Sequence, residues 1–338
     1  MTMKSPFTDG EATLQHEKKE LEFRKDTFTI IQFYYKCDDT GEEFTTDELD
    51  QINVNQLYNQ YREKYGVPFP DEIKEIREQY GLSAVKMSEI LGFGVNSYRQ
   101  YESGDIPTVA SGRLIQAARD PEEFKKFIND SKAVLTDREY KRFSERVDEL
   151  IEAKRSKLWD TMFIEQIFNH SKPTEYTGYK KPSLDRVASM LAYFSERIPD
   201  LWKTKLNKLF FYTDFLHYRR TGYSISGIAY RAIPFGPVPA EYDKLYVKLK
   251  DDQCAAIGFV EFDNGNYGET ITATRKFEPG EFTDAELNTL KDVADKFASS
   301  TTSKIVNTSH QEKAWKENKP GHDLISYQKY AFELQAIE

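Results

Sequence analysis

Apolar residues recur at helical spacing between residues 71 and 104, and this stretch carries the clearest structural pattern in the chain. These positions are Ile73, Ile76, Leu82, Ile90, Leu91 and Tyr98. Apolar residues three or four positions apart predict helices with one buried face, and the glycines at Gly81 and Gly92 mark turns between them. We therefore expect a compact helical bundle over residues 67–130 that contains a helix-turn-helix.

The first 44 residues follow a different pattern, in which apolar and polar positions alternate as in β-strands. The clearest runs are 21–24 and 28–35. Two short tetrads flank them, Ser5-Pro6-Phe7-Thr8 and Cys37-Asp38-Asp39-Thr40, and a glycine follows each within two residues. The pattern predicts a small β ribbon over residues 1–44, with a tight turn at each tetrad.

Capping-box sequences predict the starts of further helices. They are Thr45-Thr46-Asp47-Glu48, Thr136-Asp137-Arg138-Glu139 and Thr283-Asp284-Ala285-Glu286. The first opens a connecting helix over residues 45–66. The second opens a long charged helix that runs toward Met162 and, together with a linker, fills residues 131–183. Residues 184–338 have helical spacing with a small extended portion, so we expect a mostly α protein.

Composition limits the possible partners and the compartment. The net charge of −9 argues against a protein that binds polyanions over its whole surface, so any DNA contact must come from a local patch. Cys37 and Cys254 are far apart in sequence, which favours a reducing compartment. No run is long and apolar enough to span a membrane, and no signal-peptide core is present. We expect a cytoplasmic protein, whose 21 Tyr and 23 Phe suit protein recognition.

The third helix of the predicted bundle offers residues that suit DNA reading. With Tyr98 and Tyr101 pointing inward, the outward side of a helix from Val95 to Ser103 enters the major groove. Arginine pairs with guanine there, and Asn or Gln pairs with adenine. An ordinary bundle with a polar face is the alternative. The candidate DNA-binding residues are Ser83, Lys86, Asn96, Ser97, Arg99 and Gln100.

These glycine and apolar positions together resemble the Xre/Cro-type repressors. The resemblance implies a buried ion pair between Arg77 and Glu102, and a homodimer that reads palindromic operator DNA. The sequence departs from the family pattern at two positions. Ala84 stands where the family usually has a phosphate-binding Gln, and Ser88 stands where it usually has Ala.

The order of ribbon, connecting helix and Xre-type bundle resembles the MqsA antitoxins, in which the ribbon carries zinc. The two tetrads here have the outline of C-x-x-C knuckles with three of the four cysteines replaced by Ser or Thr. Hydroxyls do not replace thiolates as structural zinc ligands, so we expect no metal and no other cofactor.

Four pieces of the C-terminal half resemble the Panacea domain of SocA-like antitoxins. They are Lys205-Leu206-Asn207-Lys208-Leu209-Phe210-Phe211-Tyr212, His217 to Gly222, Phe235-Gly236-Pro237-Val238-Pro239, and Ser309-His310 with Ala314-Trp315. The resemblance implies a domain that binds and neutralises a protein toxin, and SocA-like members also deliver a toxin to a protease.

A mixed aromatic and basic helix face and the proline-glycine turn are the candidate partner contacts in this half. The alternatives are internal packing for the face and a rigid turn needed by the fold. The candidate partner-binding residues are Lys208, Tyr212, His217, Tyr218, Arg219 and Phe235.

No catalytic constellation is evident in the sequence. The five histidines lack metal-ligand spacing, Cys254 has no paired histidine, and the run Asn264–Gly268 is typical of a hairpin, not of a phosphate loop. These observations predict that the protein is not an enzyme, and the resemblances imply a type II antitoxin that neutralises a toxin and represses its own operon. A phage-linked transcription regulator or protease adaptor without a cognate toxin is the alternative.

Overall fold

The computed structural model describes residues 2–156, 168, 172–199, 201–261 and 267–337. The chain divides into two compact units, one made of residues 1–57 and 167–338 and the other of residues 58–166. The far end of the long charged helix at Met162, the start of the linker at residue 169 and most of the Asn264–Gly268 hairpin turn lie outside the described residues.

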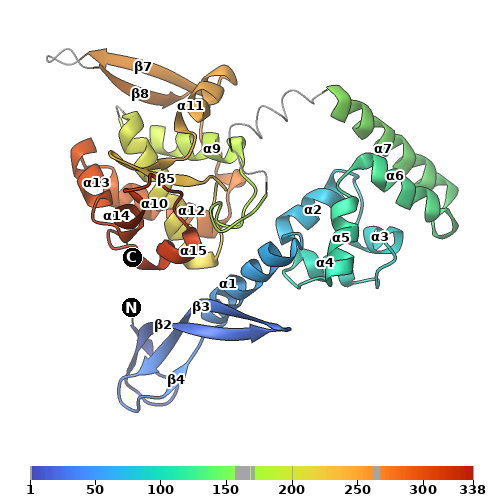
Figure 1. The fold of residues 1–338 in the computed structure, drawn as a ribbon, viewed down its shortest axis with the longest axis horizontal. Coiled ribbons are helices and arrows are strands. Elements are labelled where there is room, and N and C mark those ends of the chain that lie inside the picture. Colours follow the sequence, from blue (N-terminus) through green and yellow to red (C-terminus); the bar gives the residue numbers. More distant parts are fainter. Residues whose placement is uncertain (1, 157–167, 169–171, 200, 262–266, 338) are drawn as a thin grey trace. The chain divides into compact units, whose positions relative to one another are not determined.

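Residues 2–44 form a four-stranded antiparallel sheet in the order β1-β2-β3-β4 (Figure 1). Its strands are β1 (Thr2–Lys4), β2 (Glu11–Phe23), β3 (Asp26–Cys37) and β4 (Glu43–Phe44). The expectation of a small ribbon is wrong, because β2 and β3 pair from Ala12 opposite Cys37 to Phe23 opposite Asp26. The polar run 15–20 does not alternate like a strand by itself, and its partners on the apolar strand β3 hold it in the sheet.

Helix α1 (Asp47–Tyr65) follows the sheet and completes the edge of β3. The side-chain amide of Asn53 accepts a hydrogen bond from Phe33 N over 2.8 Å and donates one to Phe33 O over 2.9 Å. Gln56 bonds Ile31 N and O in the same way, over 2.9 and 2.8 Å. Buried strand edges need partners for their backbone groups, and these two amides supply them where β4 does not reach.

The described part of the unit of residues 58–166 is helical. Its further elements are α2 (Pro70–Glu78), α3 (Ala84–Ile90), α4 (Ser97–Glu102), α5 (Val109–Ala117), α6 (Pro121–Asp130), η1 (Lys132–Val134) and α7 (Asp137–Ser156). They share one apolar cluster that includes Ile73, Met87, Tyr98 and Phe124. The capping box at the start of α7 is confirmed, because Glu139 N donates to Thr136 Oγ1 over 3.3 Å and Thr136 N donates to Glu139 Oε2 over 3.0 Å.

The C-terminal half is built around one buried helix, α10 (Lys203–Thr221), which the other helices surround in Figure 1. The other helices are α9 (Leu184–Ser195), α11 (Tyr242–Asp251), η2 (Pro279–Glu281), α12 (Asp284–Phe297), α13 (Thr302–Ser309), α14 (Lys313–Asn318), α15 (Tyr327–Tyr330) and η3 (Ala331–Glu333). Two antiparallel hairpins complete it. They are β5 (Tyr230–Ile233) with β6 (Gly236–Pro239), and β7 (Ala255–Glu261) with β8 (Tyr267–Ala273).

A buried carboxylate on α10 positions the first of these hairpins. Asp214 accepts hydrogen bonds from the backbone N of Ile225 and Ser226 over 2.8 and 2.9 Å, and from the Tyr230 hydroxyl over 2.8 Å. Burial raises the pKa of Asp214, and the donated hydrogen bonds act against that rise. Because Tyr230 is the first residue of β5, this network fixes the start of β5 against α10.

Candidate functional site

Helix α10 holds most of the predicted partner-binding residues, and the structure places them in the interior. Every residue from Lys205 to Tyr218 on this helix is buried. A helix enclosed on all sides belongs to the core of a domain. Lys208, Tyr212, His217 and Tyr218 are therefore covered by the rest of the domain in this structure.

The polar ends of these side chains are engaged inside the domain. The Tyr212 hydroxyl donates to Glu312 Oε1 over 3.2 Å, and His217 Nδ1 lies 3.2 Å from Thr289 Oγ1. The Tyr218 hydroxyl donates to Gln328 Oε1 over 2.6 Å, and Arg219 donates to the carbonyl of Ile337 over 2.8 Å. Burial lowers the pKa of His217 to about 4, so its imidazole is neutral at physiological pH.

Lys208 differs from its neighbours because its Nζ has no hydrogen-bond partner within the described part of the chain. Burial lowers the pKa of this ammonium group to about 7. The amine lies against the start of β6, where a Cβ on Gly236 would come within 2.5 Å of Lys208 Cε and 2.5 Å of Ser309 Oγ. Gly236 has a φ of +96°, so both its backbone angle and this contact require glycine.

His310 and Trp315 complete a cluster around Lys208 and the β5–β6 hairpin. The two rings stack with centroids 3.8 Å apart and an angle of 12° between their planes. Trp315 Nε1 donates to the carbonyl of Ile233 over 2.7 Å, which ties this stack to β5. Burial, and then the charge of Lys208, lower the pKa of His310. Three of the four sequence pieces that resemble a Panacea domain therefore meet at one place.

The β5–β6 turn also carries one strongly exposed aromatic residue. Phe235 is 69% exposed, although the next residue, Gly236, is buried. Of the predicted partner-binding residues, it has the side chain most accessible to another protein.

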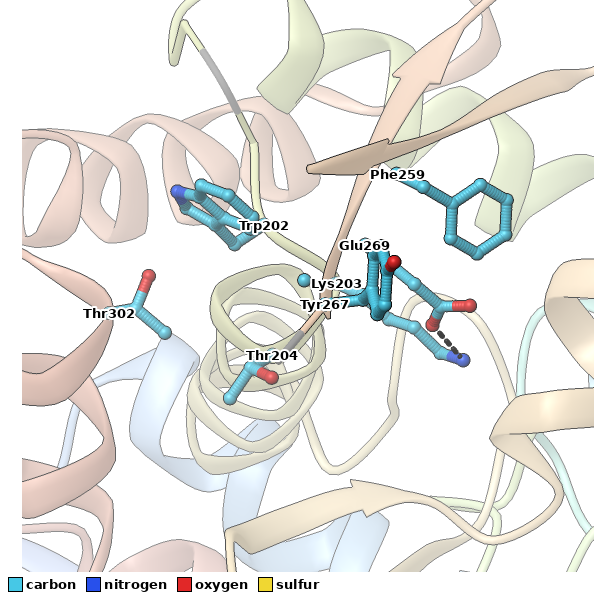
Figure 2. Close-up of a pocket in the computed structure, with 8 residues that line it drawn as sticks. Trp202, Lys203, Thr204, Phe259, Tyr267, Glu269 and Thr302 are labelled. Atoms are coloured by element: carbon cyan, nitrogen blue, oxygen red, sulfur yellow. Dashed lines mark ion pairs between the residues drawn. The ribbon is translucent and has the colours of Figure 1, made fainter. Parts of the chain in front are cut away.

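A separate groove lies beside the turn-proximal half of the β7–β8 hairpin (Figure 2). It encloses about 690 Å³, and its lining comes from the N-terminal ends of α10 and α13 and from both strands. Phe259 and Tyr267 on the hairpin are 68% and 67% exposed. Trp202 lies on the opposite side of the groove in Figure 2. Exposed aromatic side chains that gather at a groove are typical of protein-binding sites.

Charged side chains form one side of this groove. Lys203 Nζ lies 2.7 Å from Glu269 Oε2 and 3.1 Å from Asp243 Oδ1. Burial lowers the pKa of Lys203, but the two carboxylates outweigh it and the net shift is upward. The groove residues are not among the predicted partner-binding residues, although the aromatic residues Phe259, before the turn-like run, and Tyr267, within it, were a visible signal.

In the helical unit, the predicted base-reading residues are on or beside α4. Asn96, Arg99 and Gln100 are exposed and Ser97 is half-buried. Asn96 is the N-cap of α4, and Tyr98 points inward with its hydroxyl donating to Ile73 O over 2.8 Å. The side chains of Asn96, Arg99 and Gln100 are therefore accessible to a ligand.

The two predicted residues near α3 have local partners. The hydroxyl of Ser83 caps the helix by accepting from Lys86 N over 3.2 Å. Lys86 Nζ lies 2.6 Å from Glu89 and 3.1 Å from Glu139. The ion pair with Glu89 raises the pKa of Lys86, and a phosphate must compete with both carboxylates for this ammonium group.

The ion pair between Arg77 and Glu102 is present in the structure. Arg77 Nε lies 2.5 Å from Glu102 Oε1, and a second bond joins Nη2 to Oε2 over 3.2 Å. Both side chains are 15% exposed. The unusual Ser88 is buried, and its hydroxyl accepts from Tyr98 N over 3.1 Å at the start of α4. These bonds join α4 to α2 and α3.

The two tetrads of the N-terminal sheet converge on the sulfur of Cys37. Ser5 Oγ donates to Cys37 Sγ over 3.1 Å, and Thr8 Oγ1 lies 3.7 Å from the same atom. Hydrogen bonds from Ser5 and Thr40 lower the pKa of the Cys37 thiol to about 6. One thiol with three hydroxyls does not fit a structural zinc site. The described residues contain no group of three or more His, Cys, Asp or Glu side chains arranged to hold a metal.

Comparison with known families identifies part of the chain. Residues 206–316, from α10 to α14, match the family described as antitoxin SocA-like, Panacea domain. The Panacea resemblance is thus confirmed for these residues, which include Lys208, Gly236, His310 and Trp315. No curated protein and no solved structure matches the chain. None of the described helices is long and apolar enough to cross a membrane.

Proposed function

We propose that this protein is a type II antitoxin that neutralises a protein toxin by direct binding. The observation that carries the proposal is the SocA-like Panacea domain at residues 206–316. The exposed Phe235 and the aromatic groove beside Phe259 and Tyr267 offer this domain surface for a protein partner. Stoichiometric binding needs no catalytic group, which agrees with a domain whose buried polar side chains bond mainly to one another.

We further propose that α3 and α4 form a helix-turn-helix that represses the operon encoding the antitoxin. The support is the exposure of Asn96, Arg99 and Gln100 on one short helix that Tyr98 anchors in the core. These side chains have the donors and acceptors that read guanine and adenine in the major groove. Operator reading of this kind uses two copies of the module, so the proposal includes a homodimer.

A growth assay tests the neutralising role. The open reading frame beside this gene is expressed alone and together with the full chain. We expect growth arrest in the first culture and recovery in the second. A neighbouring gene that is harmless by itself would contradict the antitoxin role, and would favour a transcription regulator or protease adaptor without a toxin.

A further inference from the structure

Two buried nitrogen atoms in the Panacea domain lack hydrogen-bond partners, and they belong to one cluster. They are Lys208 Nζ and His310 Nε2, among the described residues. Buried polar atoms in folded proteins almost always have a partner, so an exception needs an explanation. Burying an amine without an acceptor also opposes folding, whereas a methionine of similar shape would carry no such cost.

A second lysine on the same helix shows what a structural lysine looks like in this domain. Lys205 is buried one turn before Lys208, and its Nζ donates to the carbonyls of Ala298 and Ser300 over 2.8 and 2.7 Å. Two carbonyl acceptors account for Lys205 within the fold. Lys208 has the same chemistry and the same helix, but no described residue gives it an acceptor.

The Lys208 cluster lies directly beneath the short turn that joins β5 to β6. Gly236 packs against the lysine side chain and Ser309, while Phe235 in the same turn is exposed to 69%. One residue of this turn thus faces outward and the next covers the amine. A partner that binds Phe235 therefore lies next to Gly236, the residue that covers the Lys208 amine.

We propose that Lys208 and His310 form a binding site for a carboxylate side chain of the protein partner. The carboxylate reaches them when the β5–β6 turn moves aside. A carboxylate has two acceptor oxygens, and ammonium and imidazolium groups are its strongest donors in proteins. The proposal rests on the proposed function, because it requires a protein partner. It explains why the domain keeps an amine where an apolar residue would suit the free protein better.

The charges around this carboxylate site predict that binding is coupled to proton uptake. The charges of Lys208 and Lys319 both lower the pKa of His310. Burial alone lowers the pKa of Lys208, with no contribution from a carboxylate of the described chain. A bound carboxylate favours the charged forms of both groups, so binding near neutral pH takes up protons from the solvent.

The experiment compares Lys208→Met with the matched control Lys205→Met in the full chain. Thermal unfolding is measured first, followed by growth rescue with the product of the adjacent open reading frame. Calorimetric titration with that product, in two buffers of different ionisation enthalpy, gives the proton uptake. We expect Lys208→Met to unfold at the same or a higher temperature, to lose rescue, and to bind at least roughly tenfold more weakly without proton uptake. We expect Lys205→Met to lose thermal stability.

Two results would contradict the proposed carboxylate site. One is a stable Lys208→Met variant that still rescues growth, and the other is a Lys208→Met variant that unfolds more easily, because the lysine would then be a structural group. His310→Gln gives an independent variant, which should also reduce proton uptake. A wild-type chain that does not rescue growth contradicts the proposed function itself, and with it the carboxylate site that depends on that function.

Discussion

The hydroxyl of Ser5 donates a hydrogen bond to the sulfur of Cys37 over 3.1 Å and so joins two turns that are 32 residues apart in sequence. Thr8 contacts the same sulfur, and its hydroxyl also donates to Asp39 over 2.8 Å. The turns therefore meet as two zinc knuckles would, but hydrogen bonds hold them where a metal would need four thiolates. The geometry of a metal site is kept while its ligand chemistry is not.

Restoring the thiols should create a metal site in this sheet. We expect the triple variant Ser5→Cys, Thr8→Cys and Thr40→Cys to bind one Co²⁺ per chain with the intense visible absorption of a tetrahedral thiolate site. The wild-type chain should show no such spectrum. Adding Cys37→Ser to the triple variant removes the fourth thiolate and should weaken the band. A wild-type chain that binds Co²⁺ with the same spectrum would contradict the account of Cys37.

Lys208 should make stability depend on pH in the alkaline range. Its pKa is about 7 in the folded protein and 10.5 when unperturbed, so between these values the unfolded chain binds more protons. The free energy of unfolding therefore rises with pH across this window, by up to about 1.4 kcal/mol per pH unit. Below pH 7 the folded and unfolded forms are both protonated, and the contribution no longer changes.

Urea unfolding of wild type and Lys208→Met from pH 7 to 10 measures this slope by difference. The stability of the variant relative to wild type should be greatest at pH 7 and fall as the pH rises. Equal slopes for the two proteins would mean that Lys208 titrates normally in the folded state.

The ion pair of Arg77 and Glu102 should contribute strongly to the stability of the helical unit. Replacing Arg77 with Met leaves Glu102 largely buried without its partner, and we expect a loss of roughly 3 kcal/mol in the free energy of unfolding. The double variant Arg77→Met, Glu102→Gln should lose less than the sum of the single variants. Additive losses in chemical denaturation would show that the pair is not coupled.

Local signals in the sequence predicted the helices well. The capping boxes at Thr136 and Thr283 are both present, with Glu139 and Glu286 bonding back to the residue that starts each helix. Such boxes involve residues four positions apart at most, so the sequence alone specifies them. The strand β2 could not be recognised in this way, because its polar middle becomes a strand only through pairing with β3.

The candidate site was less accessible from sequence because burial is a tertiary property. Tyr212, His217 and Tyr218 have the polar groups of a binding face, but Glu312, Thr289 and Gln328 satisfy them from distant segments. That Lys208 has no acceptor among the described residues is equally invisible without the fold. The turns that carry Ser5 and Cys37 were readable, because each tetrad has its own turn signal.

Arg99 should contribute base-specific affinity if α4 reads operator DNA. Changing Arg99 to Ala removes a guanidinium group that can bond two acceptors of guanine, so we expect a loss of roughly 1–3 kcal/mol in binding to the promoter of this gene. Fluorescence anisotropy with promoter DNA and a scrambled duplex measures the effect. Arg138→Ala removes an exposed positive charge from α7 and is the matched control. Equal losses on both duplexes would assign Arg99 to the phosphate backbone.

The groove beside the β7–β8 hairpin should contribute to partner binding through Phe259. Phe259 and Val260 are neighbours on β7, so their side chains point to opposite faces of the hairpin, and Phe259 lines the groove. Phe259→Asp places a charge on the aromatic surface, and we expect it to weaken binding of the adjacent gene product by at least roughly tenfold. Because Phe259 is already exposed, the thermal stability of the variant should be unchanged. Val260→Asp carries the same charge on the other face and should bind normally, whereas equal losses in both variants would assign the effect to the hairpin as a whole.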